Sequence, residues 1–185
     1  MLRGMRILPV MLLATLALQV QAAETRRENF GDWGFICSKA DSQENTQESC
    51  NLFQTALLNN EQAGGGEAGD EGGGQRVLLT RVGYLDGNEN PVLLITAPLG
   101  ILLPMKITVE VEGHETISIP VQRCDAGGCL AYVVMEKPFI DAFRKAPEAK
   151  VTFYDMQRRG VTIPLSLKGF TKGVGELVAS RNVQP

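Results

Sequence analysis

Four cysteines and a single histidine are the residues of this sequence best suited to redox or metal chemistry. The cysteines form two pairs along the chain, Cys37 with Cys50 and Cys124 with Cys129. Neither pair has zinc-finger spacing and His114 is far from both, so we expect disulfides and no metal site. Of the three pairings that four cysteines allow, we choose the two local ones, because each closes a short segment between neighbouring predicted strands.

The Cys124–Cys129 segment also supports an alternative function. Disulfides that close short loops are sometimes catalytic, so a thiol-disulfide active protein that uses this pair is the runner-up. The segment lacks the Cys-x-x-Cys spacing and the βαβ setting of thioredoxin-like proteins. A structural clamp on a hairpin is therefore the preferred interpretation.

Acid–base and nucleophilic catalysis find little support in the sequence. His114 falls at the predicted tip of a β-hairpin, where we expect a solvent-facing turn residue, and any Ser-His-Asp triad would have to use it. No pair of carboxylates has a recognised catalytic spacing. We therefore predict no catalytic residue, no cofactor and no enzymatic activity.

Residues 1–22 predict a cleavable secretory signal peptide. Two arginines precede an almost entirely apolar stretch, Ile7 to Val20, and small residues follow it at a signal-peptidase site. The stretch is shorter than the roughly 20 residues of a membrane-spanning helix. We expect cleavage after Ala22 or Ala23, no transmembrane segment in the mature chain, and a periplasmic, secreted or outer-membrane-associated location.

Residues 23–185 have a length typical of one domain. The whole chain has 18 Lys and Arg against 21 Asp and Glu, and loss of the leader removes basic residues only. An acidic mature protein argues against nucleic-acid binding. Residues 62–75 are rich in glycine and acidic residues and almost free of apolar ones, which predicts a flexible loop between two strands.

Alternating apolar and polar residues predict roughly nine short strands separated by turn residues, the pattern of an all-β sandwich. The predicted strands are Trp33–Lys39, Cys50–Leu58, Gln75–Leu85, Val92–Ala97, Ile107–Glu112, Thr116–Gln122, Leu130–Met135, one around Val151 and Phe153, and one from Val161 to Leu167. One or two short peripheral helices complete the prediction. The first is opened by Pro138 and the second runs from Phe170 to Ser180, although Gly173 and Gly175 weaken it.

The hairpin between the fifth and sixth of these strands has a predicted register. A three-residue loop of Gly113, His114 and Glu115 would place Val111 opposite Ile117. It would also place Ile107 opposite Val121, so that every apolar side chain lies on one face.

The segment from Val92 to Met105 is nearly all apolar, and its Pro98 to Pro104 turn is the candidate binding site. Its two prolines and Gly100 prevent a continuous strand or helix, leaving Leu99, Ile101, Leu102 and Leu103 in a turn. One interpretation is a buried crossover between two sheets. The other is an exposed apolar lip that contacts a partner, because soluble domains seldom expose such patches without a use.

A set of short motifs resembles the invasion-associated locus B family. The motifs are Phe30-Gly31-Asp32-Trp33 followed by Cys37, then Cys50, the Pro98–Pro104 stretch, Cys124 with Gly128-Cys129, and Pro164-Leu165-Ser166-Leu167-Lys168-Gly169-Phe170. Their order and spacing cover almost the whole mature chain, from Asn29 to about Leu177. The glycine-rich stretch at 62–75 departs from the typical family pattern.

The resemblance implies an exported protein of Gram-negative bacteria with an immunoglobulin-like β-sandwich and the disulfides Cys37–Cys50 and Cys124–Cys129. It also implies a role in virulence, since the family is named for members that help a pathogen enter host cells, notably erythrocytes. The sequence hypothesis is a non-catalytic binding module whose partner is an unknown protein, an envelope component or a host-cell surface. A housekeeping envelope-stabilising protein is a further alternative.

Overall fold

The computed structural model describes residues 25–39, 48–59, 74–85 and 87–182. The predicted signal peptide and residues 62–73 of the predicted loop lie outside these ranges. Gly74 and Gln75, the end of that loop, instead begin a strand. In the described ranges no helix is both long and apolar enough to cross a membrane.

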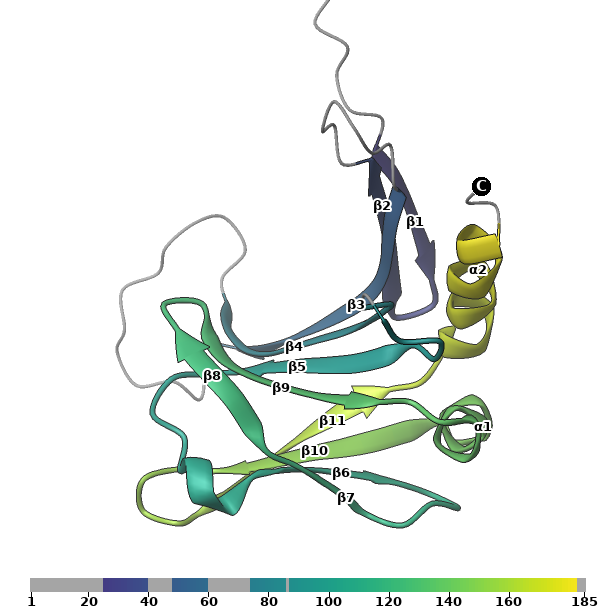
Figure 1. Cartoon of the computed structure of the whole chain (residues 1–185). Helices are drawn as coiled ribbons and strands as arrows, with labels where there is room; N and C mark the ends of the chain where they lie inside the picture. Colours follow the sequence, from purple (N-terminus) through teal and green to yellow (C-terminus); the bar gives the residue numbers. More distant parts are fainter. Residues whose placement is uncertain (1–24, 40–47, 60–73, 86, 183–185) are drawn as a thin grey trace, which may run out of the picture.

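Two antiparallel sheets form the molecule (Figure 1). The larger sheet has seven strands, in the order β1 (Thr25–Phe30), β2 (Trp33–Lys39), β3 (Glu48–Asn59), β4 (Gly74–Gly83), β5 (Val92–Ala97), β9 (Gly128–Val134) and β8 (Val121–Asp125). The smaller sheet has four strands, in the order β11 (Gly160–Ser166), β10 (Glu148–Tyr154), β6 (Ile107–Val111) and β7 (Ile117–Ile119). The helices are α1 (Lys137–Lys145), α2 (Phe170–Asn182) and the single-turn η1 (Leu103–Met105). The predicted β-sandwich with short helices is confirmed, and the narrower description as immunoglobulin-like stays a prediction.

Two strands differ from the sequence prediction. Strand β1 was not expected, because its side chains are mostly polar and exposed, and it forms by pairing with β2 along its whole length. The predicted strand Thr116–Gln122 is two strands, because Pro120 interrupts it. Proline has no N–H to donate to a ladder, and here the chain leaves the small sheet for the large one.

The predicted register of the β6–β7 hairpin is wrong by two residues. Ile117 lies opposite Val109, and Ile119 lies opposite Ile107. The loop is longer than expected because the His114 N–H donates to the Val111 carbonyl in a turn before β7 begins. Side chains alternate with a period of two, so a shift of two residues keeps the same apolar face.

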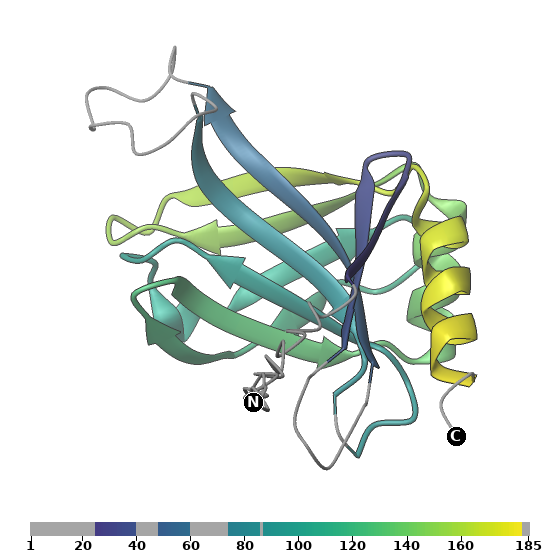
Figure 2. The same ribbon diagram turned by 90° about the horizontal axis from the view of Figure 1, so that it is seen from above.

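The core lies between the sheets and continues under the helices. Helix α2 covers the part of β1, β2 and β3 that extends beyond the small sheet, as both ribbon views show (Figures 1 and 2). A series of ring contacts joins these layers, with centroid distances of 5.5 Å for Trp33–Phe170, 5.2 Å for Phe143–Phe170 and 4.7 Å for Phe139–Phe143. Trp33 is fully buried at the start of this series.

Candidate functional site

The Pro98–Pro104 stretch, predicted to contact a partner, is the crossover from β5 in the large sheet to the small sheet. The Leu102 N–H donates to the Tyr154 carbonyl at 2.7 Å. Ile101 forms an isolated antiparallel bridge with Asp155. Strand β10 and the turn after it therefore hold the backbone of the crossover.

The four predicted contact residues lie in different environments. Ile101 is buried and Leu102 is half-buried, whereas 58% of Leu99 and 47% of Leu103 are exposed. The predicted buried crossover is therefore observed at Ile101 and the predicted exposure at Leu99 and Leu103, while contact with a partner stays a prediction. Ile101 anchors a crossover between the sheets, and Leu99 and Leu103 project outward from it.

Two exposed methionines enlarge this apolar surface. Met105 ends η1 and is 42% exposed, and Met156 lies in the β10–β11 turn and is 63% exposed. Figure 1 shows η1 beside that turn. Leu99, Leu103, Met105 and Met156 are called the apolar lip below. Neither methionine was among the predicted contact residues, although Met105 ends the apolar segment singled out in the sequence. An apolar residue inside the charged turn 155–159 was a usable signal for Met156.

Asp155 fixes the turn that carries Met156. Its carboxylate accepts hydrogen bonds from the backbone N–H groups of Gln157 and Arg159, each at 2.9 Å, and from the Arg159 guanidinium at 2.7 Å. The backbone hydrogen bond from Arg159 is the largest of the effects that lower the pKa of Asp155 below its ordinary value. The turn is thus held by contacts to an ionised carboxylate.

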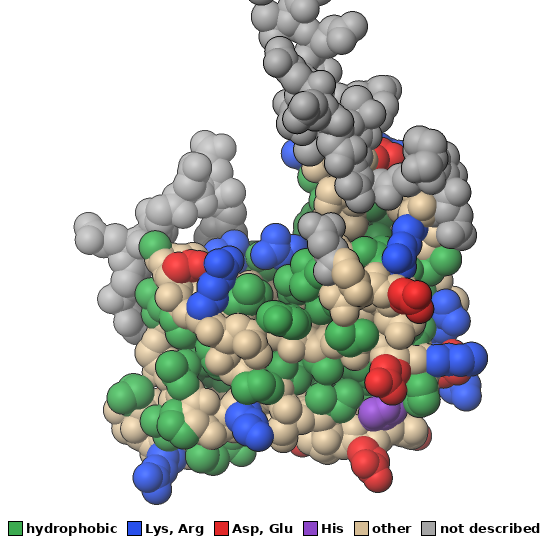
Figure 3. Space-filling model, viewed as in Figure 1, with side chains coloured by type: hydrophobic (Ala, Val, Ile, Leu, Met, Phe, Trp, Pro, Cys, Tyr) green, Lys and Arg blue, Asp and Glu red, His purple; other side chains and the backbone are tan. Residues whose placement is uncertain are grey.

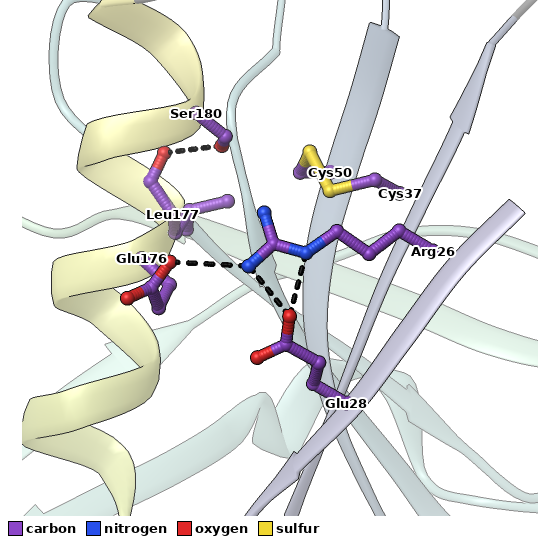
Figure 4. Close-up of a disulfide and its surroundings, with 7 residues drawn as sticks. All are labelled: Arg26, Glu28, Cys37, Cys50, Glu176, Leu177 and Ser180. Carbon is purple, nitrogen blue, oxygen red and sulfur yellow. Dashed lines mark hydrogen bonds and ion pairs between the residues drawn. A yellow bond between two sulfur atoms is a disulfide. The ribbon is translucent and has the colours of Figure 1, made fainter.

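Both disulfides join the expected partners. Cys37 and Cys50 lie directly opposite each other in β2 and β3, beside Arg26, whose guanidinium contacts carboxylates of β1 and α2 (Figure 4). Cys124 and Cys129 close the turn between β8 and β9. The two bonds differ in access, since Cys124 is exposed while Cys37 is buried.

One group of side chains in the described ranges brings metal-ligand types together. Cys37, Glu48 and Cys50 place their ligand atoms within 4.8 Å of one another. The two sulfurs share a disulfide, however, and metal binding by cysteine requires the thiolate. The group therefore does not fit a metal ion.

His114 is not the solvent-facing turn residue that the sequence predicts. It is half-buried, and its ring centroid lies 5.2 Å from that of Phe139 in α1. Nδ1 is 2.8 Å from the Glu115 carbonyl. The side chain packs the hairpin against α1, a contact that depends on elements from two places in the chain.

The motifs that carry the family resemblance meet in a structural junction. The Ser166 hydroxyl donates to the Asp32 carboxylate at 2.7 Å, and the Trp33 indole N–H donates to the Ser166 carbonyl at 2.9 Å. The Gln54 amide bonds both backbone groups of Ser166, at 3.0 and 3.1 Å. These contacts tie β11 of the small sheet to the large sheet. Sequence reasoning missed the role of Gln54, which no local pattern reveals.

Fold and site together define a two-layer β-sandwich braced by two disulfides, with an apolar lip on the connection between its sheets. The model of the invasion associated locus B protein family matches residues 66–177, more than half of the chain. The chain belongs to this family.

Two proteins show the likeness in sequence and in structure. Invasion protein B of Bartonella bacilliformis is 26% identical over 131 residues, which is 70% of this chain and 61% of that protein. The crystal structure of invasion associated protein B from Bartonella henselae superposes with a TM-score of 0.66 at 18% identity, covering 85% of this chain and 97% of the other. The second comparison supports the fold alone.

Proposed function

We propose that this protein is an exported, non-catalytic binding protein of the bacterial envelope, and that the apolar lip makes the contact. The observation that carries the proposal is the combination of exposed side chains and a fixed backbone. Leu103 and Met156 project from segments that the Leu102–Tyr154 hydrogen bond and the Asp155 contacts hold in place. A partner would therefore lose little conformational entropy in ordering this surface.

Export is supported by the leader-like N-terminal sequence and by the two disulfides, which persist in oxidising compartments. Protease treatment of intact cells, compared with cells whose outer membrane has been opened, distinguishes a protein on the cell surface from one in the periplasm. Digestion on intact cells supports a surface protein and a role in host-cell invasion, as the names of the two relatives suggest. Protection until the membrane is opened supports a periplasmic role, including that of a housekeeping stabiliser.

The lip is tested by placing a photo-crosslinking amino acid at position 103 in living cells. We expect a discrete crosslinked protein band that Leu99→Asp abolishes, because a carboxylate disfavours burial against an apolar partner. Leu103 is a better position than Leu102, since Leu102 is half-buried and its substitution would disturb packing.

Leu85, an exposed leucine outside the lip, provides the matched control. Crosslinking from position 85 should give a different pattern. Identical patterns from positions 85 and 103, or no band at position 103, would remove the lip from the proposal.

A thiol-disulfide active protein is the second candidate, and the exposure of Cys124 is the observation that favours it. An accessible sulfur is open to attack by an external thiolate, whereas its partner Cys129 is buried. The reduction potential of this bond separates the two functions.

A further inference from the structure

The large sheet has an outer face that points away from the small sheet. Leu52, Val82 and Leu93 point inward and are fully buried, so their sequence neighbours point outward. One outward row runs through Phe53, Arg81, Leu94 and Tyr132 in four paired strands. The next row contains Thr55, Leu79, Thr96, Leu130 and Arg123.

This outer face is unusually apolar for a sheet face that no described helix or strand covers. Phe53, Leu79, Leu94 and Leu130 are half-buried, and Tyr132 is 40% exposed. The Phe53 ring lies over Gly34, where a Cβ would come within 2.4 Å of it. The ring is therefore fixed on the face by contact with the neighbouring strand.

Most of the charges on the described part of this face are arginines, and one carboxylate, Asp125, lies beside Arg123. Arg81 belongs to the first row, and the pairing of β1 with β2 places Arg27 on the same side of the sheet. Both are exposed, and neither has a carboxylate within ion-pair distance in the described part of the chain. Arg123, at the β8 edge, lies 3.9 Å from Asp125. In Figure 3 basic side chains gather along the upper margin of the strands that lie over the small sheet.

The face is concave. In Figure 1, β1, β2 and the first part of β3 stand upright against α2, while β4, β5 and β9 lie over the small sheet. The outward rows lie on the inner side of this bend. A concave apolar surface that carries these arginines fits an elongated partner better than a planar bilayer.

We infer that this concave face docks a polypeptide segment of another protein whose apolar side chains are flanked by carboxylates. Arginine binds carboxylates through two parallel hydrogen bonds, and the apolar rows would bury the segment's apolar side chains. A second copy of this chain is disfavoured, because the face would meet its own arginines. The inference goes beyond the proposed function, since the face is built from different residues from the apolar lip and either surface can fail without the other.

The probe for this inference is a fluorescent amphipathic peptide made of Leu and Glu at helical spacing, with a Leu and Lys peptide of the same pattern as control. We expect fluorescence anisotropy to show binding of the acidic peptide only. Arg81→Glu should weaken it by about tenfold or more, because it replaces a charge-assisted hydrogen bond by repulsion. The variant should fold normally, since Arg81 is exposed.

Lys145→Glu is the matched control variant, because it makes the same charge change on the exposed end of α1. It should change the affinity by less than about twofold. Tyr132→Ser should also weaken binding, which tests the apolar part of the face separately from its charge.

Four outcomes would overturn the inference. Equal binding of the basic peptide, or no effect of Arg81→Glu, would remove the arginines from it. Arg81-dependent binding to phosphatidylglycerol vesicles without peptide binding would assign the face to a lipid surface. A dimer in sedimentation that Arg81→Glu dissociates would assign it to a second copy of the chain.

Discussion

At the scale of single residues, two glycines determine how closely the ends of the domain approach. Gly31 lies in the β1–β2 turn and Gly169 lies just before α2, both with positive φ. A Cβ on Gly169 would be 1.8 Å from the Phe30 carbonyl oxygen, and one on Gly31 would be 2.5 Å from that of Lys168. The two turns pack backbone against backbone, which explains why glycine occupies both positions.

Gly169→Ala should therefore be strongly destabilising. The added methyl group meets backbone atoms and the residue must keep φ +92, so we expect a loss of at least about 2 kcal/mol in the free energy of unfolding. Thermal unfolding should show this as a fall in Tm of about 4 °C or more.

Gly175→Ala, within α2, is the control for that substitution. Outside its own helix, no atom in the described part of the chain would lie within 4 Å of an added Cβ at this position. Alanine should therefore stabilise the protein by about 0.5–1 kcal/mol. If both variants change Tm in the same direction, the close packing of the two turns is not what matters at Gly169.

Asp155 should make the stability of the lip turn depend on pH. The pKa of Asp155 is lower in the folded protein than its ordinary value of 3.8, chiefly through the backbone N–H of Arg159. A carboxylate with a depressed pKa stabilises the fold above its unfolded pKa, and this contribution is lost as pH falls through the folded value. Asp155→Asn should thus lower Tm near neutral pH, and the difference from wild type should shrink below about pH 4.

Arg159→Gln separates the two sources of this effect. It removes the guanidinium but keeps the backbone N–H, so it should retain most of the pH dependence. Parallel Tm curves for wild type and Asp155→Asn across the acidic range would mean that the charge of Asp155 does not stabilise the turn.

At the scale of elements, the two disulfides brace different hairpins. Cys37–Cys50 crosslinks β2 to β3 beneath α2, and Cys124–Cys129 closes the β8–β9 turn at the edge of the sheet. From the loop-closure entropy of the unfolded chain, we expect the first disulfide to stabilise the fold by about 3 kcal/mol and the second by about 2 kcal/mol. The edge bond therefore contributes less stability and is also more accessible.

A redox titration followed by thiol alkylation and mass spectrometry should show this difference. We expect Cys124 and Cys129 to become labelled before Cys37 and Cys50, because Cys124 is exposed and Cys37 is buried. If the edge bond is structural, its reduction potential should lie below about −300 mV. A markedly more oxidising value would instead favour the thiol-disulfide active function.

At the scale of the whole molecule, the outer faces of the two sheets are unlike. The small sheet presents a row of hydroxyl side chains, Thr162, Thr152, Thr108 and Ser118, in paired positions. The large sheet presents apolar rows with arginines. The two outer faces therefore differ in polarity, and the apolar lip lies on the crossover between the two sheets.

Much of this architecture could be predicted from the sequence, and the reasons are local. The alternation of Val109 and Val111 with polar residues defines a half-buried strand without reference to the rest of the chain. Pro138 and the residues after it define α1 in the same way. Strand β1 was missed because its stability comes from its partner rather than from its own pattern.

The site was less predictable than the fold. Leu99 and Leu103 were identified because the prolines and Gly100 of an apolar stretch exclude a continuous strand or helix. Their separation from Ile101 required the position of β10. Met156 joins the lip only because the β10–β11 turn is adjacent to η1. The role of Gln54 likewise depends on a residue more than a hundred positions away.

The sequence by itself determined most of the strands, the helices, the cysteine pairs and the family, because periodicity, turn residues and spacing act over short distances along the chain. Only the tertiary structure decided the hairpin register, the environment of His114, the extent of the lip and the concave face. Each of these depends on side chains from distant segments meeting in space, and their packing energy is set by neighbours that a linear pattern does not contain.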